Sequence, residues 1–382
     1  MKPGLPVVYF TVFLDLVGFG IILPQLPFYA EAFGATGVWV GAILTAYSAA
    51  QLVGASLLGR LSDRVGRRPV LLMSLAGSAA SFLLCGLAHS LWLLLVARAL
   101  AGLFGGSIAA AQAYIADVTA PGERAKYMGL LGASIGLGFV FGPALGSGLA
   151  RFGFGAAAFA AASLAAANLV FAFFRLPETR GPEERRHAHA RVDLSNLLDA
   201  LHHPSTGRLL AATFLSTLAF VAMEATFALL GEARFGLDAS RLGLVFAYVG
   251  VVMVIVQGGL VGRLAPRFGE RALATVGALV MAASLGALPL VPTLGAALGV
   301  LAGLAVGQGL TTPMLATLLS RAADADEQGG TLGLGQSLAA AARAVGPIGA
   351  GWLYDRAVGA PYAASAVVMV LAALLVGTVR AD

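Results

Sequence analysis

Long apolar segments are the feature that most constrains this sequence. Each is about 20 residues long, the length an α-helix needs to cross a bilayer. Charged residues make up only 11% of the 382 residues, whereas soluble domains carry about 25%. A soluble protein could not cover its surface with so few charges, so we predict an all-α membrane protein and exclude a cytosolic enzyme, a nucleic-acid binder and a disordered scaffold. The twelve predicted spans lie near 7–29, 38–58, 70–88, 91–116, 127–149, 156–174, 208–230, 242–261, 272–291, 294–319, 331–353 and 362–379.

The twelve spans form two sets of six on either side of one polar stretch. This arrangement predicts an N-terminal six-helix bundle over 1–174, a cytoplasmic linker over 175–207 and a C-terminal six-helix bundle over 208–382. Leucines at helical spacing between Leu194 and Leu201 predict a short amphipathic helix on the membrane surface within the linker. A disordered tether is the alternative interpretation of the linker.

Basic residues are distributed unequally over the segments that join the spans. With the N-terminus in the cytoplasm, the inner segments hold 18 Lys and Arg residues and the outer segments hold four. Because basic residues concentrate on the cytoplasmic side of membrane proteins, we expect both termini in the cytoplasm and a multi-pass location in the inner membrane. The net positive charge lies in loops that flank the membrane, so nucleic acid is not an expected partner.

The sequence shows no sign of a cofactor or a catalytic centre. It has one cysteine, Cys85, and no His, Cys and carboxylate cluster at metal-ligand spacing. It also lacks the G-x-x-x-x-G-K-[ST] motif of ATP-binding loops. We therefore expect no metal, no cofactor and no catalytic residues, and a proton gradient as the energy source.

The two halves carry an internal repeat. The segment Gly59–Arg68 recurs as Gly262–Arg271 at an offset of 203, and the Gly-Pro pair at 142–143 recurs at 346–347 at an offset of 204. A nearly constant offset over this length indicates two parallel, pseudo-symmetric six-helix halves. Repeats of this kind place a substrate site near the middle of the membrane, where the halves meet.

Several of these segments resemble the major facilitator superfamily. The loop Gly59–Pro69 resembles the superfamily's signature between helices 2 and 3, and Arg98 with Gly102 resembles its helix-4 motif. The segment Leu14–Pro27 is similar to helix 1 of the tetracycline/proton antiporters and related twelve-span drug exporters. The resemblance implies two six-helix bundles around a cavity that opens alternately to each side.

A glycine-rich stretch in the fifth span resembles the helix-5 motif of antiporters. In the family this motif implies a closely packed interface that prevents leak, while generic packing of small residues is the alternative. The residues of the motif are Gly138, Gly142, Pro143 and Gly146.

Four charged residues lie well inside predicted spans, namely Asp15, Arg98, Glu224 and Arg343. A charge at the bilayer centre costs at least about 2.5–3.5 kcal/mol, so such residues are functional by default. Burial favours the neutral form of a carboxyl and a nearby arginine favours the charged form, so a carboxyl exposed to each side in turn can carry a proton. We assign proton coupling to these four residues. Permanent Asp15–Arg98 and Glu224–Arg343 ion pairs that only fix helix packing are the alternative.

Polar and aromatic side chains within the spans are the expected substrate contacts. Arg98 and Gln112 are predicted to lie on one face of a single helix together with small residues. Interhelical hydrogen bonding and lipid contact are the alternative roles for this set. Its members are Phe19, Gln25, Gln112, Phe220, Phe227, Gln257, Gln308 and Gln336.

The loop after the second span is the expected gate. Gly59 and Gly66 permit a tight cytoplasmic hairpin, and Asp63 can sit at a helix N-terminus, which the resemblance identifies as helix 11. Arg64 or Arg67 can pair with Asp117. A cytoplasmic anchor without a gating role is the alternative. The full gating set is Gly59, Asp63, Arg64, Gly66, Arg67, Arg68 and Asp117.

These features predict a secondary active transporter that exports small amphipathic, drug-like compounds in exchange for protons. Its expected partners are a small-molecule substrate, protons and the lipid bilayer, and we expect a monomer. Proton-coupled uptake or facilitated diffusion of a small anionic metabolite is the nearest alternative. A non-transporting membrane receptor or enzyme is a more distant one.

Overall fold

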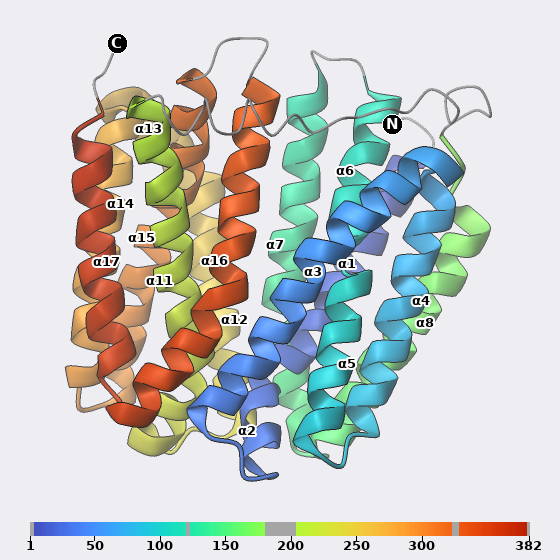
Figure 1. Cartoon of the computed structure of the whole chain (residues 1–382), viewed down its shortest axis with the longest axis horizontal. Coiled ribbons are helices and arrows are strands. Elements are labelled where there is room, and N and C mark those ends of the chain that lie inside the picture. Colours follow the sequence, from blue (N-terminus) through green and yellow to red (C-terminus); the bar gives the residue numbers. More distant parts are fainter. Residues whose placement is uncertain (1–3, 120–122, 180–203, 323–327, 380–382) are drawn as a thin grey trace. The chain divides into compact units, whose positions relative to one another are not determined.

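The computed structural model describes residues 4–119, 123–179, 204–322 and 328–379, without the side chains at 63, 124–126, 328 and 329. Every regular element in these ranges is a helix (Figure 1). Eleven helical segments in the described part are long and apolar enough to cross a membrane. The helix Gln328–Arg356 covers the remaining predicted span. The prediction of an all-α protein with twelve spans is therefore confirmed.

The chain divides into two compact units. The first consists of Met1–Ala35, Ala46–Ala190 and Asp238–Ala247, and the second of Thr36–Thr45, Arg191–Leu237 and Tyr248–Asp382. The helices of the first half of the chain are α1 (Leu5–Ile22), η1 (Leu23–Gln25), α2 (Leu26–Glu31), α3 (Gly37–Val65), α4 (Arg67–Gly86), α5 (Leu91–Phe104), α6 (Ser107–Val118), α7 (Arg124–Ala150) and α8 (Phe154–Arg175).

The second half of the chain also consists of helices. They are α11 (Pro204–Phe235), α12 (Ala239–Ile255), the π-helical η3 (Val256–Leu260), α13 (Val261–Phe268), α14 (Glu270–Ala287), η4 (Leu288–Leu290), α15 (Leu294–Arg321), α16 (Gln328–Arg356) and α17 (Ala360–Gly377). Helix α11 begins four residues before the predicted start of the second bundle. The leucine stripe between Leu194 and Leu201 lies outside the described residues.

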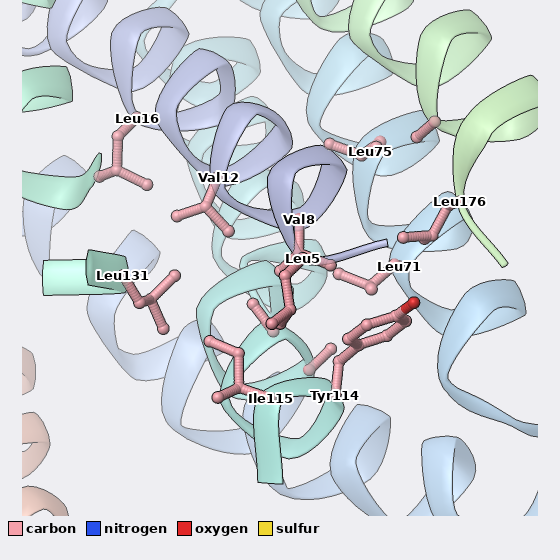
Figure 2. Packing of buried hydrophobic residues seen from close by; sticks show 13 residues of the cluster. Leu5, Val8, Val12, Leu16, Leu71, Leu75, Tyr114, Ile115, Leu131 and Leu176 are labelled. Atoms are coloured by element: carbon pink, nitrogen blue, oxygen red, sulfur yellow. The ribbon is translucent and has the colours of Figure 1, made fainter. Parts of the chain in front are cut away.

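Helix α1 is fixed in the first unit by one apolar face. Leu5, Val8, Val12 and Leu16 recur at helical spacing, and all four are buried. They pack in one cluster with residues of α4, α6, α7 and α8, among them Tyr114 (Figure 2). This packing sets the position of Asp15 one residue before Leu16. In the second unit, a corresponding cluster joins α11, α14, α15, α16 and α17.

The glycines of the helix-5 motif bring α7 against α1. A Cβ atom on Gly142 would lie 2.7 Å from the Gly20 Cα, and one on Gly146 would lie 2.6 Å from the Ile21 carbonyl oxygen. A Cβ atom on Gly138 would lie 2.5 Å from the Leu16 Cβ. These contacts leave no room for side chains, so the motif packs the two backbones directly together within the first unit.

The fourth predicted span is not one helix. Helix α5 ends at Phe104 and α6 begins at Ser107, with Gly105 and Gly106 between them. The expectation that Arg98 and Gln112 share one continuous helix face is therefore wrong, since Arg98 is fully buried and Gln112 is exposed. The break gives α6 an N-terminus of its own in the middle of the span.

The first residues of α3 belong to the second unit. There the Asp355 carboxylate on α16 accepts hydrogen bonds from the backbone N–H groups of Gly37 and Val38, at 2.7 and 2.9 Å. Gly351, one turn before Asp355, has its Cα so close to Gly37 that a Cβ atom would lie 2.0 Å from the Gly37 carbonyl oxygen. Asp355 therefore caps the N-terminus of a helix whose remainder, from Ala46 on, lies in the first unit.

Candidate proton-coupling and gating sites

Asp15 lies at the break between α5 and α6. Its side chain belongs to α1 and is only 8% exposed. The Ser107 hydroxyl donates a hydrogen bond of 2.5 Å to Asp15 Oδ2, and Ser78 on α4 hydrogen-bonds to the same carboxyl. Ser107 is the first residue of α6, where the helix dipole favours negative charge. The helix break thus builds a polar site for a carboxyl inside the membrane-spanning part of the unit.

A cavity of about 40 Å³ adjoins Asp15. Its polar lining includes Tyr47, Gln51, Ser78 and Ser107. The Gln51 amide donates to the Tyr47 hydroxyl at 3.1 Å and to the Gly105 carbonyl oxygen at 3.2 Å, which ties α3 to the helix break. One buried water molecule needs about 10–15 Å³ of cavity volume and two to four polar partners, so the cavity is suited to a small cluster of water molecules.

Arg98 on α5 lies beside this cavity and is fully buried. Its guanidinium carbon is 4.5 Å from the centre of the Tyr47 ring and 5.3 Å from that of the Phe19 ring, and both rings line the cavity. None of its three side-chain nitrogens has a hydrogen-bond partner among the residues that the structure describes. The arrangement is therefore not the permanent Asp15–Arg98 ion pair that we considered as the alternative role.

Glu224 and Arg343 occupy the second unit. Glu224 lies on α11 and Arg343 on α16, both half-buried, and the two helices pack against one another. The charge of Arg343 acts electrostatically on the Glu224 carboxyl. Asp15 and Glu224 are thus carboxyls well inside spans of the two units, and among the described residues Glu224 interacts with its arginine whereas Asp15 does not.

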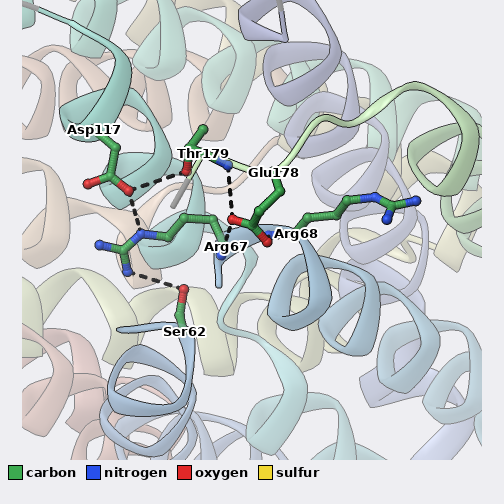
Figure 3. Close-up of polar contacts among 6 residues, drawn as sticks. All are labelled: Ser62, Arg67, Arg68, Asp117, Glu178 and Thr179. Carbon is green, nitrogen blue, oxygen red and sulfur yellow. Dashed lines mark hydrogen bonds and ion pairs between the residues drawn. The ribbon is translucent and has the colours of Figure 1, made fainter. Parts of the chain in front are cut away.

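The predicted gating loop is a turn around Gly66, held by a polar network (Figure 3). Gly66 has a φ of 111°, which favours glycine, and a Cβ atom there would also collide with the Glu178 carboxylate. Arg67 is the arginine that pairs with Asp117, with 2.8 Å between Nε and Oδ2. Its Nη1 donates to the Ser62 hydroxyl at 3.2 Å. The pair joins the start of α4 to the end of α6.

Glu178 completes the network and was missed by the sequence analysis. Its carboxylate accepts hydrogen bonds from the backbone N–H groups of Arg67 and Arg68, at 2.9 and 3.3 Å, and so caps the N-terminus of α4. Arg68 in turn donates through Nη2 to the Phe173 carbonyl oxygen at 2.7 Å. The network therefore fastens the segment after α8 to the turn, which involves the linker in the proposed gate.

The other predicted gating residues, Gly59, Asp63 and Arg64, are not among the residues drawn in Figure 3. Gly59 lies inside α3, which continues to Val65, so the expectation that it helps to form the hairpin is wrong. One glycine with a positive φ is enough for this turn. Arg64 is exposed. The side chain of Asp63 lies outside the described residues.

Comparison with known proteins identifies the family. Residues 8–347 match the family model of the Major Facilitator Superfamily. The chain belongs to this superfamily. It is therefore a membrane transporter of small molecules and not an enzyme.

The transporter has relatives that align over almost its whole length. It is 34% identical to the class G tetracycline resistance protein of Vibrio anguillarum over 94% of this chain and 92% of the relative. It is 30% identical to the class B tetracycline resistance protein of Escherichia coli over 88% and 84% of the two chains. Among solved structures, the human organic anion transporter MFSD10 aligns with a TM-score of 0.73, 27% identity and 98% coverage of both chains. A bacterial homolog of the lysosomal transporter Spinster shares the fold, with a TM-score of 0.82 at 15% identity over 99% and 97%.

The expected substrate residues of the transporter have different environments. Phe19 lines the cavity beside Asp15, whereas Gln25 is buried and donates to the carbonyl oxygens of Ile21 and Gly146, which is a structural role. Phe227 is 1% exposed and packs in the interior of the second unit. Phe220 and Gln308 are half-buried. The exposed members of the set are Gln112, Gln257 and Gln336.

The site of the transporter contains four polar residues that sequence reasoning missed, Tyr47, Gln51, Ser78 and Ser107. Tyr47 and Gln51 are one helical turn apart on α3, so their spacing was a usable signal. Ser78 and Ser107 could not be recognised from the sequence, because single serines are common in membrane helices. Among the described residues there is no group of three or more His, Cys, Asp or Glu that could hold a metal ion.

We expect Arg67→Ala to destabilise the transporter and Arg64→Ala to leave its stability almost unchanged. Removing Arg67 takes its guanidinium away from Asp117 and Ser62, while Asp117 keeps the hydrogen bond from Thr179, and the loss costs about 1–3 kcal/mol (Figure 3). Arg64 is exposed, so its removal should change stability by less than about 0.5 kcal/mol. Thermal unfolding of the two purified variants measures the difference. Equal unfolding temperatures would show that the network does not stabilise the turn.

Proposed function

We propose that this transporter exports small amphipathic compounds in exchange for protons. The observation that carries the proposal is Asp15, a buried carboxyl in a membrane-spanning helix that borders a cavity lined in part by polar side chains. A carboxyl costs free energy in this position, so its presence favours a role in moving a proton. Glu224 beside Arg343 is the second carboxyl to which we assign proton coupling.

The proton gradient is large enough to drive such an exchange. Each proton that enters supplies about 1.36 kcal/mol per pH unit and about 2.3 kcal/mol per 100 mV of membrane potential. A carboxyl that faces each side of the membrane in turn takes up a proton outside and releases it inside. A substrate that competes with the proton for Asp15 or Glu224 then leaves in the opposite direction.

The relatives and the sequence motifs favour export of drug-like compounds. Besides the tetracycline resistance proteins, the chain is 28% identical to multidrug resistance protein 2 of Bacillus subtilis over 68% of its length. The glycines of the helix-5 motif resemble those of antiporters, and they pack tightly against α1. We further propose a monomer in the inner membrane with both termini in the cytoplasm and no cofactor.

Transport by reconstituted protein tests the proposal. Liposomes that are acidic inside should accumulate tetracycline or the cationic dye ethidium through those protein molecules whose cytoplasmic face points outward, and should release protons as they do so. Nigericin, which collapses the pH gradient, should stop the accumulation. If Glu224→Gln left both the rate and its pH dependence unchanged, Glu224 would have no part in proton coupling.

Uptake of a small organic anion is the second candidate function. Arg98 favours it, because a buried guanidinium without a hydrogen-bond partner in the described protein is suited to an anionic group. The human relative of known structure is described as an organic anion transporter. Accumulation of a carboxylate such as benzoate, without any movement of tetracycline or ethidium, would favour this function over export.

A further inference from the structure

The aromatic surroundings of Arg98 form a distinct structural feature. The rings of Phe19 and Tyr47 lie 5.1 Å apart, and the Arg98 guanidinium lies over both of them. We call these two rings the aromatic cradle. Cations bind to ring faces more strongly where water is excluded, and Arg98 is fully buried. The cradle therefore holds the guanidinium in a position in which described protein groups provide no hydrogen bond to it.

The cradle is built from two helices that are themselves held in place. Phe19 lies on α1 one turn after Asp15. On α3, the backbone at Tyr47 contacts α5 so closely that a Cβ atom on Gly102 would lie 2.0 Å from the Tyr47 carbonyl oxygen. The Gln51 amide donates to the Tyr47 hydroxyl and to Gly105. The ring that lies nearer to Arg98 is thus fixed by contacts to the helix break.

The position of Arg98 matters because of what it would do to Asp15. An arginine next to a carboxyl favours the charged form and would hinder proton uptake. In this structure the Asp15 carboxyl is bonded instead by the hydroxyls of Ser107 and Ser78. The other titratable groups that act on Arg98 are the Cys85 thiol on α4 and the Tyr47 phenol. Neither group is a carboxylate. Asp15 borders the same cavity as the cradle, so it is the carboxylate with which Arg98 would pair if the guanidinium moved.

We propose that the aromatic cradle holds Arg98 away from Asp15 while Asp15 carries a proton, and that Arg98 moves to the carboxylate when the proton leaves. The proton passes from the carboxyl to water, Arg98 keeps its own proton, and only the position of the guanidinium changes. Tyr47 is then a positioning residue for proton coupling, and it acts through Arg98. This inference rests on the proposed role of Asp15 in proton coupling.

Removal of the Tyr47 ring tests the proposal. In Tyr47→Leu, Arg98 is free to pair with Asp15, so the carboxyl should lose its proton at a pH lower by about one unit, a tenfold change in proton affinity. The infrared carbonyl band of the protonated carboxyl, assigned through its loss in Asp15→Asn, reports this titration directly. The pH midpoint of tetracycline-dependent proton release should shift in the same direction. Tyr47→Phe keeps the aromatic ring, so its Asp15 carboxyl should titrate as in the wild type.

Other variants separate the proposal from general damage. Tyr248→Leu removes an exposed tyrosine from a membrane helix of the second unit and is the matched control. Phe19→Leu removes the other ring and should shift the titration in the same direction, which provides a test if Tyr47→Leu does not fold. A wild-type titration in Tyr47→Leu would overturn the proposal, and so would an equal shift in Tyr47→Phe. Unchanged proton release in Asp15→Asn would instead overturn the proposed role of Asp15 itself.

Discussion

Asp15→Asn is expected to reduce proton-driven transport by about 100-fold or more, an effect comparable to the loss of a general acid or base in an enzyme. Asparagine has nearly the same shape as aspartic acid and can accept the hydrogen bond from Ser107, but it cannot carry a proton. Exchange of substrate across the membrane without a pH gradient should persist, because it does not require a net proton movement. Tetracycline accumulation in acid-loaded liposomes measures the proton-driven activity. Tetracycline counterflow in liposomes without a pH gradient measures the exchange.

Glu232→Gln is the matched control for this prediction, since Glu232 is an exposed acid at the end of α11. It should retain both activities. Loss of accumulation together with loss of counterflow in Asp15→Asn would indicate a structural defect. Retention of proton-driven accumulation would show that Asp15 is not needed for coupling, and would leave Glu224 as the proton carrier.

Gly142→Leu is expected to prevent the first unit from packing. A Cβ atom there would lie 2.7 Å from the Gly20 Cα and 2.8 Å from the Val17 carbonyl oxygen, which are backbone atoms of α1 and cannot rotate away. Inserting even a few atoms into a packed interior costs about 1–3 kcal/mol, and a leucine at a contact between backbones should exceed that range. We expect little monodisperse protein after detergent extraction, and a lower unfolding temperature for what remains.

Gly148→Leu is the control on the same helix. A Cβ atom on Gly148 would meet no atom within 4 Å apart from the adjacent backbone of α7 itself, so the substitution requires no movement of α1. Leucine also has a higher helix propensity than glycine by up to about 1 kcal/mol, so stability should be unchanged or slightly raised. Size-exclusion profiles and thermal unfolding of the two variants give the comparison. Equal behaviour of Gly142→Leu and Gly148→Leu would mean that α1 and α7 are not in direct backbone contact.

The helices could be predicted from the sequence because the membrane imposes one length and one composition on every span. All twelve predicted segments coincide with one helix or with two or three consecutive helical elements. The break at Gly105 and Gly106 could not be predicted, because two glycines within an apolar run change neither its hydropathy nor its length. Gly59 was wrongly assigned to the turn because the repeat gives it the same apparent importance as Gly66. The structure shows that Gly66 has the positive φ that the turn requires, whereas Gly59 lies within α3.

The charged part of the candidate site followed from the cost of burying a charge, which singled out Asp15, Arg98, Glu224 and Arg343. The neutral residues around Asp15 did not follow from this cost, because single serine, tyrosine and glutamine residues are tolerated in membrane helices, and the spacing of Tyr47 and Gln51 was the one signal among them. Glu178 was missed because it lies in a polar segment, where a carboxylate is unremarkable until the fold brings it to the N-terminus of α4. Sequence reasoning thus finds residues that are costly in their local environment, and overlooks those whose role depends on distant segments.

Helix α3 is one continuous helix whose first residues belong to the second unit and whose remaining residues belong to the first. Its first residues are fastened to α16 through Asp355, and its remainder, from Ala46 on, packs in the first unit. Backbone N–H groups in the first turn of a helix have no acceptor within the helix, so the Asp355 carboxylate supplies the acceptors that Gly37 and Val38 would otherwise find in water. Its negative charge also complements the positive end of the helix dipole, so the start of α3 is set by a side chain that lies 318 residues after Gly37 in the chain.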